Sequence, residues 1–422
     1  MRVWLITVGE PLPIPGAKGR LLRTGLLAEA LYVRGHEITW WTSTFDHWNK
    51  RHYFSRDAVA EIAPGYQIRL LKGPGYRRNV SFGRIIDHYL TARKFAGQAR
   101  LEERPDVILC SLPTINLAGA AVKFGCEAGV PVVVDIRDMW PDIFLELVPN
   151  QARRPARFFM KPMFRAVRSA CSGAAAITGH APAFVEWGLR NAGRSRTERD
   201  RDFPYGYKSE PPSAQTMQAA RGFWSRLGLS GEGDEFVVCF FGTIGRYFEL
   251  ETVIKAARLL GSADKKIRFV LCGAGESLSF YKGLAVGCEN VTFPGWIGAA
   301  QIKSLMSLSS VGLAPYRNSS SFVISIPNKA IEYLSAGLPI VSSLKGVLKD
   351  LLTANDCGLH YENGDAKGLA AALCVLSESP SRRKILGKNA LALFKKRFAA
   401  KKVYHDMSVF LEETAAKEKG LN

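Results

Sequence analysis

Short apolar runs alternate with longer segments of helical periodicity along most of the chain. The runs Pro105–Ser111, Val130–Ile136 and Phe236–Phe241 have the length of β-strands. Strands that are apolar on both faces are typical of buried parallel sheets. Between such runs, leucine and alanine recur three or four positions apart, as in Leu21–Leu31 and Leu250–Leu260. This alternation predicts repeated βα units that form two doubly wound sheets, and 422 residues are enough for two domains.

Glycine-rich and charged segments follow two strand patterns of the first half. Gly16, Gly19 and Arg20 lie in the loop after Arg2–Val8, and Arg137 and Asp138 follow Val130–Ile136 directly. α/β folds bind their ligands at the carboxyl ends of parallel strands, so both segments are candidate sites. A plain structural turn at Gly16–Gly19, and an Arg137–Asp138 pair that ties down a loop, are the alternatives.

The second half has a glycine loop of its own. Gly242, Thr243, Gly245 and Arg246 follow Phe236–Phe241, and Gly273 and Gly275 follow the next strand pattern. Glycines between a strand and a helix leave backbone N–H groups accessible to a phosphate, and an arginine adds fixed positive charge. The second half is therefore predicted to bind phosphate.

A short helix is predicted after Ser325. Ser325 is expected to cap its N-terminus, Pro327 suits its first turn and Gly337 ends it. Lys329 and Glu332 lie three residues apart and share one face. A lysine beside a helix N-terminus favours a diphosphate, and a carboxylate one turn later can accept ribose hydroxyls. An ordinary salt bridge between the two side chains is the alternative.

Three motifs of this stretch carry a resemblance to a known family. Pro327-Asn328-Lys329, Glu332-Tyr333 and Ala336-Gly337-x-Pro339 resemble the signature of GT-B glycosyltransferases of family 4, and most closely the branch that builds O-antigen and capsule-type surface polysaccharides. The resemblance implies a GT-B fold of two Rossmann-like domains that face each other across a cleft. It places an acceptor domain at 1–205, a nucleotide-sugar domain at 206–395 and a terminal helix at 396–422 that returns to the first domain.

The resemblance also implies roles for the candidate residues. Glu332 would bind the ribose, main-chain groups near Trp296 and Ile297 would read the base, and Arg246 and Lys329 would stabilise the departing diphosphate. The donor site would further include the set Gly242, Thr243, Gly245, Gly273, Gly275, Pro327 and Asn328. Gly16, Lys18, Gly19 and Arg20 would form the acceptor loop, in which Lys18 and Arg20 can meet a phosphate. The expected activity is retaining transfer of a hexosyl or N-acetylhexosaminyl group.

Two positions depart from the common family pattern. Ile324 stands where many members have a glutamate that contacts the sugar. Arg137 lies near the position of a histidine that contacts the transferred sugar in many members, within an Arg-Asp-x-Trp-Pro motif similar to that of the surface-polysaccharide branch. The identity of the sugar and the roles of Arg137 and Asp138 therefore stay open.

The charge is strongly positive, with 57 Lys and Arg against 38 Asp and Glu. Residues 69–100 and 151–172 combine basic with aromatic side chains and contain almost no acid. Such segments suit anionic surfaces, namely phospholipid, a lipid-linked diphosphate or nucleic acid, although no nucleic-acid-binding motif is present. We expect a cytoplasmic enzyme on the inner face of the plasma membrane with a polyprenyl-diphosphate-linked acceptor. Core-facing helices with a charged outer face are the alternative.

Cysteine and histidine give no sign of a metal site. The eight cysteines form no Cys-x-x-Cys pair and the histidines no ligand cluster, so we expect reduced thiols, no cofactor and no metal. The N-terminus reads as a first strand rather than a signal peptide. A nucleotide-sugar epimerase of the same fold and a non-catalytic basic protein that binds membranes or polyanions are the alternative functions.

Overall fold

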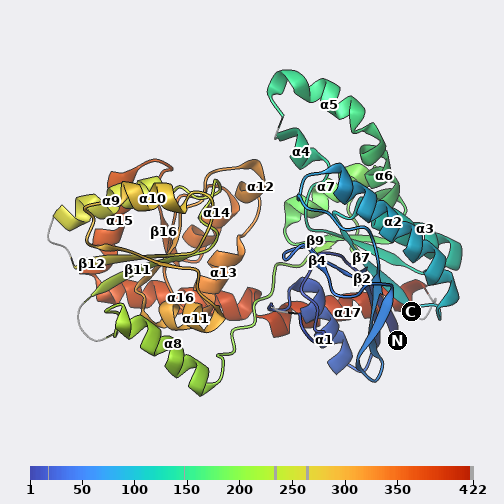
Figure 1. Ribbon diagram of the computed structural model, residues 1–422, viewed down its shortest axis with the longest axis horizontal. Helices are drawn as coiled ribbons and strands as arrows, with labels where there is room; N and C mark the ends of the chain where they lie inside the picture. The colour runs from blue at the N-terminus through green and yellow to red at the C-terminus, as the bar shows by residue number, and fades with distance from the viewer. Residues whose placement is uncertain (18, 147, 232–234, 263–265, 419–422) are drawn as a thin grey trace. The chain divides into compact units, whose positions relative to one another are not determined.

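The computed structural model describes residues 1–17, 19–146, 148–231, 235–262 and 266–418. The chain forms two compact units, one of Met1–Gly206 together with the chain from Lys401 onward, and one of Tyr207–Ala400. In each unit, helices cover a central and largely parallel sheet (Figure 1).

The N-terminal unit contains an eight-stranded sheet in the order β10-β9-β8-β7-β1-β2-β6-β5. Neighbouring strands are parallel except for β5 and β6, which pair antiparallel at one edge. The strands are β1 (Arg2–Ile6), β2 (Glu37–Ser43), β5 (Ala58–Ala63), β6 (Tyr66–Leu71), β7 (Val107–Leu112), β8 (Val132–Ile136), β9 (Ala176–Gly179) and β10 (Arg201–Asp202). β3 (Phe45–Asp46) and β4 (Arg51–His52) form a separate antiparallel pair.

The helices of this unit are α1 (Arg23–Val33), α2 (Phe82–Gln98), α3 (Ile115–Ala128), α4 (Asp142–Glu146), α5 (Arg153–Phe159), α6 (Lys161–Ser172), α7 (Pro182–Ala192) and α17 (Ala400–Glu418), with 3-10 turns η1 (Ala99–Leu101) and η2 (Asn150–Ala152). α4 and α5 extend beyond the layers that cover the sheet (Figure 1). α17 packs on this unit, where Phe410 meets Phe203 with ring centroids 5.3 Å apart.

The C-terminal unit contains a six-stranded parallel sheet in the order β13-β12-β11-β14-β15-β16. Its strands are β11 (Phe236–Phe241), β12 (Ile267–Cys272), β13 (Val291–Gly295), β14 (Val311–Ala314), β15 (Ile340–Ser342) and β16 (Gly358–His360). Its helices are α8 (Ala214–Arg226), α9 (Leu250–Ser262), α10 (Leu278–Leu284), α11 (Ala299–Leu308), α12 (Ser320–Val323), α13 (Asn328–Ser335), α14 (Val347–Ala354), α15 (Ala366–Glu378) and α16 (Pro380–Arg397). The strand order reverses between β11 and β14, and such a switch point opens a crevice at the carboxyl ends of the strands.

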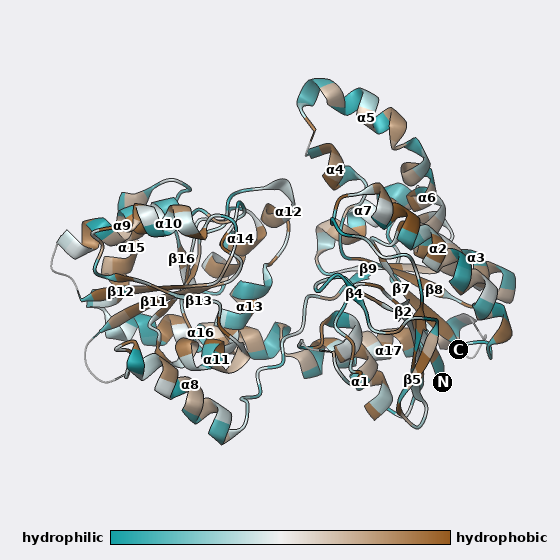
Figure 2. Ribbon diagram, viewed as in Figure 1, coloured by the Kyte–Doolittle hydropathy of each residue, from teal (hydrophilic) through white to brown (hydrophobic). Residues whose placement is uncertain are grey.

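Both sheets have apolar strands with helices on each side, as the alternation of the sequence predicts. Every residue of β7, β8 and β11 is buried, and the sheets carry the hydrophobic colour in Figure 2. In the N-terminal core the rings of Trp4 and Trp41 lie 5.3 Å apart, and Phe95 of α2 packs edge-on against Trp41 at 5.2 Å. Burial of a large apolar side chain contributes about 1.5–3 kcal/mol, so these rings fix α2 to the sheet.

Candidate functional site

The loop after β11 lies directly beside the loop after β12. The amide of Gly242 donates to the carbonyl of Cys272 at 3.0 Å, and the amide of Ile244 donates to the carbonyl of Ala274 at 2.9 Å. A Cβ at Gly273 would stand 1.8 Å from the carbonyl oxygen of Gly242. The two predicted glycine loops are therefore held against each other at the carboxyl edge of the sheet.

The loop after β13 continues this edge. The amide of Gly273 donates to the carbonyl of Gly295 at 2.7 Å, which brings the segment that contains Trp296 and Ile297 beside the second glycine loop. The side chain of Trp296 is 77% exposed, whereas Ile297 is buried. Neighbouring strands β11, β12 and β13 thus contribute the loops on one side of the switch point.

Lys329, the second residue of α13, approaches the same carboxyl edge of the sheet. Its ammonium group donates to the carbonyl of Phe241 and lies 4.9 Å from the ring centroids of both Phe240 and Phe241. A Cβ at Gly242 would stand 2.5 Å from the lysine Nζ. The N-terminus of α13, with Pro327 and Asn328, therefore meets the Gly242 loop, although 88 residues separate Lys329 from Phe241.

The start of α13 differs from the prediction in one respect. Pro327, with φ −64° and ψ 143°, occupies the N-cap position, and the hydroxyl of Ser325 donates instead to the carbonyl of Ser321 at 3.0 Å. The predicted serine cap was wrong because α13 begins at Asn328, which leaves Ser325 two residues before the N-cap position. The predicted end at Gly337 is confirmed, since its φ of +65° is the left-handed conformation that glycine favours.

Tyr333 fixes α13 to the sheet. Its hydroxyl donates to the carbonyls of Cys239 and Leu313, at 3.2 and 3.1 Å. The preceding residue, Glu332, is only 7% exposed. Burial first, and the charge of Glu332 second, raise the pKa of the Tyr316 hydroxyl. Glu332 is thus held in a rigid position one turn beyond Lys329.

Arg246 lies on the solvent side of the Gly242 loop. Its guanidinium donates to the Tyr247 hydroxyl at 3.0 Å, and this hydrogen bond raises the pKa of the arginine. Arg246 is exposed, whereas Lys329 is buried beneath the same loop. The loop is therefore positively charged on both of its sides, which favours a phosphate.

Comparison with known proteins connects these loops to a family and a fold. Residues 229–392 match the profile of the family "Glycosyl transferases group 1", which includes every donor-site residue predicted above. Sucrose-phosphate synthase from Thermosynechococcus elongatus superposes with a TM-score of 0.69 at 18% identity, over 99% of both chains. The fold is GT-B. HepE from Anabaena, solved in complex with UDP-glucose, reaches a TM-score of 0.61 at 16% identity, over 98% of this chain and 100% of the other.

WaaG, a glycosyltransferase involved in lipopolysaccharide biosynthesis, gives a TM-score of 0.62 at 14% identity over 100% of both chains. No curated protein sequence matches the chain. At these identities the solved structures establish the fold alone. The family match in the C-terminal half, taken with the GT-B fold, supports a nucleotide-sugar glycosyltransferase.

In the N-terminal unit, the predicted acceptor loop follows β1. Gly16 and Gly19 have φ angles of +80° and +140°, and both are exposed together with Arg20. A Cβ at Gly19 would stand 3.2 Å from the side chain of Pro11. Lys18 lies outside the described residues.

Arg137 joins a buried charge network instead of pairing with Asp138. It donates to Asp135 at 2.9 Å, to Glu10 and to the Thr24 hydroxyl at 2.9 Å, and Arg23 forms a bidentate pair with Asp135 at 2.9 and 3.0 Å. Burial opposes ionisation of Asp135, but the charges and hydrogen bonds of both arginines outweigh it and hold the pKa of this carboxyl far below its usual range. Arg137 therefore ties the loop after β8 to the loop after β1.

Asp138 belongs to a different cluster. It accepts hydrogen bonds from the Met139 amide at 2.9 Å and from Trp140 Nε1 at 3.2 Å, and burial raises its pKa. The ring of Trp140 lies beneath the guanidinium of Arg84. The sequence interpretation placed Arg84 and Tyr76 in a membrane-directed segment and gave His47 no role, so these residues were missed as site candidates. Their only sequence signal was arginine and tyrosine just beyond the carboxyl end of an alternating strand.

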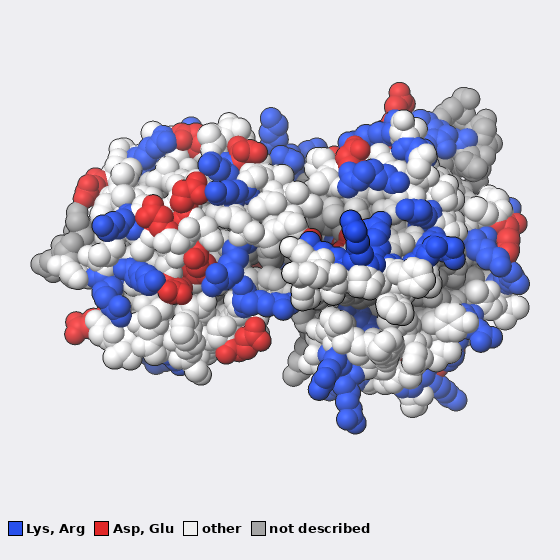
Figure 3. Space-filling view, turned by 90° about the horizontal axis from the view of Figure 1, so that it is seen from above, with Lys and Arg blue, Asp and Glu red and all other residues white. Residues whose placement is uncertain are grey.

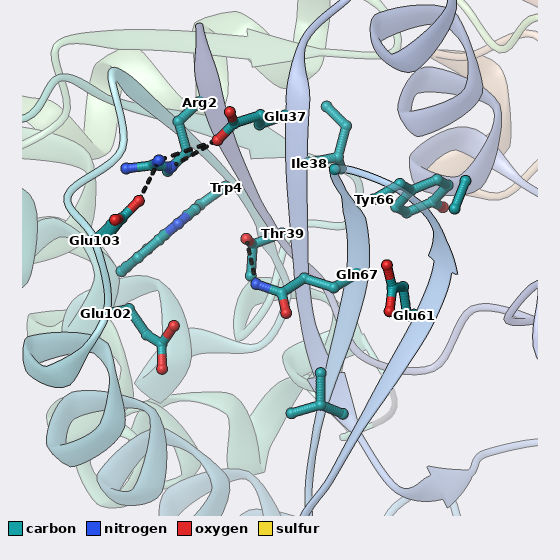
Figure 4. Close-up of a pocket in the computed structure, with 13 residues that line it drawn as sticks. Arg2, Trp4, Glu37, Ile38, Thr39, Glu61, Tyr66, Gln67, Glu102 and Glu103 are labelled. Carbon is teal, nitrogen blue, oxygen red and sulfur yellow. Dashed lines mark hydrogen bonds and ion pairs between the residues drawn. The ribbon is translucent and has the colours of Figure 1, made fainter.

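A pocket at the opposite edge of the N-terminal sheet is a poor candidate for a nucleotide. Its lining includes Arg2 and four glutamates, Glu37, Glu61, Glu102 and Glu103 (Figure 4). Arg2 pairs there with Glu37 at 3.0 Å and with Glu103. Glu102 pairs with Arg69, but four glutamates against these two arginines leave a net negative charge that would repel a diphosphate. Across the described residues, no group of three His, Cys, Asp or Glu is arranged to hold a metal ion.

Proposed function

We propose that this chain is a retaining glycosyltransferase that moves a sugar from a nucleotide-diphosphate sugar to a lipid-linked saccharide during assembly of cell-surface polysaccharide. The observation that carries the donor half of the proposal is the convergence of the Gly242–Arg246 loop with Lys329 and the start of α13 at a switch point. Support for the donor class comes from HepE, which was solved with UDP and with UDP-glucose.

In the proposed reaction, negative charge grows on the diphosphate as the bond to the sugar breaks. Arg246 and Lys329 provide fixed positive charge, and the N-terminus of α13 adds backbone donors, so the leaving group is stabilised without a metal ion. Glu332 accepts hydrogen bonds from the ribose hydroxyls, and main-chain groups at Trp296 and Ile297 contact the base. In a retaining reaction on one face of the sugar, the departing phosphate takes the proton of the acceptor hydroxyl.

The transferred group is proposed to be a hexose or an N-acetylhexosamine. Ile324 ends the turn formed by α12, next to Ser325, so an apolar side chain stands where a carboxylate would contact a sugar hydroxyl.

We place the acceptor at the N-terminal unit, on the loop of Gly16, Lys18, Gly19 and Arg20 and near Arg137 and Asp138.

The membrane part of the proposal is supported by α5 and α6, where Phe158 and Phe159 are 70% and 80% exposed. Arg154, Arg157, Lys161, Arg165 and Arg168 line a shallow pocket around Phe158 and Phe164. Figure 3, seen from the side on which α5 projects, has Lys and Arg gathered over this unit with few Asp or Glu among them. No helix in the described ranges is long and apolar enough to cross a bilayer. We propose that the protein attaches peripherally to the cytoplasmic face of the inner membrane.

A thermal-shift screen with UDP-, GDP- and dTDP-sugars tests the donor assignment. A nucleotide-sugar present at 100 times its dissociation constant stabilises the folded state by about 2.7 kcal/mol and raises Tm. Arg246→Ala is the first variant, because this exposed side chain can be removed without disturbing the core. Loss of a charged hydrogen bond costs about 1.5–3 kcal/mol, so we expect at least tenfold weaker binding. Glu332→Gln and Lys329→Ala test the ribose and the diphosphate contacts.

Lys255→Ala is the matched control, since Lys255 is an exposed lysine of the same unit that pairs with Glu251 on α9. Equal shifts for the wild type, Arg246→Ala and Glu332→Gln would contradict the donor site. Formation of an epimer from the nucleotide-sugar alone would contradict glycosyl transfer.

A further inference from the structure

A half-buried cluster of basic and aromatic side chains lies at the carboxyl edge of the N-terminal sheet. His47 and Lys50 lie between β3 and β4, just after β2; Tyr76 lies after β6, and Trp140 lies after β8. Arg84, from the first turn of α2, reaches into the middle of this group. Gly9, in the loop after β1, lies beside His47, because a Cβ there would stand 3.7 Å from the His47 Cβ.

Arg84 is held between two rings. Its guanidinium carbon lies 4.4 Å from the centroid of the Trp140 ring and 5.5 Å from that of Tyr76, and Nη1 donates to the carbonyl of Asn79 at 3.0 Å. The Nε of Arg84 is buried without a hydrogen-bond partner. Among the residues that the structure describes, no carboxylate lies within ion-pair distance of this guanidinium. Stacking on the two rings fixes the plane of the Arg84 guanidinium group and leaves some of its N–H groups as donors for an anion.

The groups around Arg84 add positive charge. Lys50 places its ammonium 4.9 Å from the centroid of the Tyr76 ring, and the Tyr76 hydroxyl is hydrogen-bonded to His47 Nδ1 at 2.6 Å. Burial, followed by the charges of Lys50 and Arg84, lowers the pKa of His47 to about 4. His47 is therefore neutral near pH 7, and because its Nδ1 is bound to Tyr76, Nε2 is the ring nitrogen left for a ligand.

The nearby carboxylates, those of Asp46, Asp87 and Asp138, accept hydrogen bonds from groups other than Arg84. Asp138 accepts from Met139 and Trp140, and Asp87 accepts from the amide of Gly75 at 2.7 Å. Burial raises the pKa of both groups, and the charge of Arg84 opposes this shift. A fixed arginine, a lysine and two ring surfaces without a paired acid are the chemistry that recognises a phosphate attached to a sugar.

We propose that Arg84, with Lys50, His47, Tyr76 and Trp140 around it, forms the subsite that binds a phosphate group of the acceptor. The assignment to the acceptor rests on the proposed function, whereas the binding of phosphate at this cluster can be tested by itself. The subsite lies wholly within the N-terminal unit.

Calorimetric titration with inorganic pyrophosphate is the test. The nucleoside diphosphate of the nucleotide-sugar that gives the largest thermal shift is present at saturation, so that the proposed donor site is closed to the probe. Arg84→Gln removes the charge and the fork, and we expect at least tenfold weaker binding of pyrophosphate. Arg84→Lys keeps the charge without the planar fork and should recover part of the affinity, which a merely structural role of Arg84 would not produce. Circular dichroism melting confirms that each variant folds.

Arg190→Gln is the matched control, because it removes one exposed arginine from α7 of the same unit. It should bind pyrophosphate as the wild type does. Equal affinity of the wild type and Arg84→Gln, or an equal loss in Arg190→Gln, overturns the subsite. If a nucleotide-sugar raises the Tm but pyrophosphate binds independently of Arg84, this inference alone is overturned. If no nucleotide-sugar raises the Tm, the proposed function is overturned.

A second titration with farnesyl diphosphate identifies the source of the phosphate. If farnesyl diphosphate binds the wild type more tightly than pyrophosphate does, and Arg84→Gln loses this binding, the subsite is assigned to a lipid-linked diphosphate. Equal binding of the two probes, again lost in Arg84→Gln, assigns it to a phosphate carried by a soluble acceptor. Binding of farnesyl diphosphate that Arg84→Gln leaves intact counts against the subsite.

Discussion

Gly275 must be a glycine because the loop after β11 packs against it. A Cβ there would stand 2.2 Å from the carbonyl oxygen of Ile244, and the φ of this residue is +156°. The sequence suggested that these glycines open the backbone to a phosphate. In the structure they allow two loops of the proposed donor site to pack against each other, which fixes the position of the Gly242–Arg246 loop.

Gly275→Ala should therefore weaken both folding and nucleotide binding. A methyl group forced against a backbone carbonyl costs about 1–3 kcal/mol, and the displaced Ile244 segment moves Arg246 with it. Thermal melting with and without nucleotide measures both effects. Gly283→Ala on α10 is the control, since no atom lies within 4 Å of its added Cβ and alanine favours a helix. A Gly275→Ala protein with the Tm and nucleotide shift of the wild type would contradict this account.

At the scale of elements, buried strands and long helices were the predictable part. The predicted strand at Phe236–Phe241 coincides with β11, and the helical pattern at Leu250–Leu260 lies within α9. The β5–β6 hairpin was missed because Glu61, Gln67 and Arg69 alternate with apolar residues on an edge that is only partly buried. Residues 69–100 were interpreted as a basic segment that lies on an anionic surface or forms a core-facing helix with a charged outer face. In the structure α2 is that helix, whereas the end of β6 at the start of the segment was not recognised.

α2 also has an unusual exposed face. Phe82 is 86% exposed and Ile86 is 53% exposed, whereas the buried side of the helix contains Asp87, His88 and Phe95. Helical spacing alone could not show which side packs on the sheet, because polar residues that hydrogen-bond locally can be buried. Apolar side chains on the outside of α2 and α5 are consistent with the proposed membrane contact.

Replacement of both Phe158 and Phe159 by serine should weaken vesicle binding. Inserting a phenylalanine into the interface contributes up to about 1.5–3 kcal/mol, so loss of two should reduce partitioning at least tenfold. Sedimentation with vesicles of phosphatidylglycerol and phosphatidylcholine measures this, and vesicles of phosphatidylcholine alone should bind more weakly. Phe280→Ser is the control, because Phe280 is a 61% exposed phenylalanine of the C-terminal unit. Unchanged binding of the double variant, or an equal loss in Phe280→Ser, would refute the membrane role of α5.

At the scale of the whole molecule, the last helix belongs to the first unit. Glu412 of α17 accepts from Arg34 at 2.7 and 2.8 Å and contacts His36 Nε2 at 2.6 Å, across more than 370 residues of sequence. The helix itself could be predicted from its periodicity. Its docking could not be derived from local pattern, because contacts of such long range leave no trace in residue spacing, and only the family resemblance suggested it.

Acid should loosen this contact. The hydrogen bond from Arg34 is the main reason that the pKa of Glu412 falls from 4.5 to about 2. A carboxyl whose folded pKa is depressed stabilises the fold above its ordinary pKa, and this contribution is lost as the pH falls through the folded value. The difference in urea midpoint between the wild type and Glu412→Gln should be largest near pH 6 and should shrink between about pH 4.5 and 2. Glu413→Gln, the neighbouring position, is the control. A difference that stays constant with pH would contradict the role of Glu412.

The most direct measurement is a crystal structure of the chain soaked with a nucleoside diphosphate. The nucleoside diphosphate is that of the nucleotide-sugar that gives the largest thermal shift. We predict that the diphosphate lies between the Gly242–Arg246 loop and the N-terminus of α13, with Arg246 and Lys329 as its cationic neighbours and the ribose against Glu332. A diphosphate bound elsewhere on the C-terminal unit, or a ribose turned away from Glu332, would contradict the account.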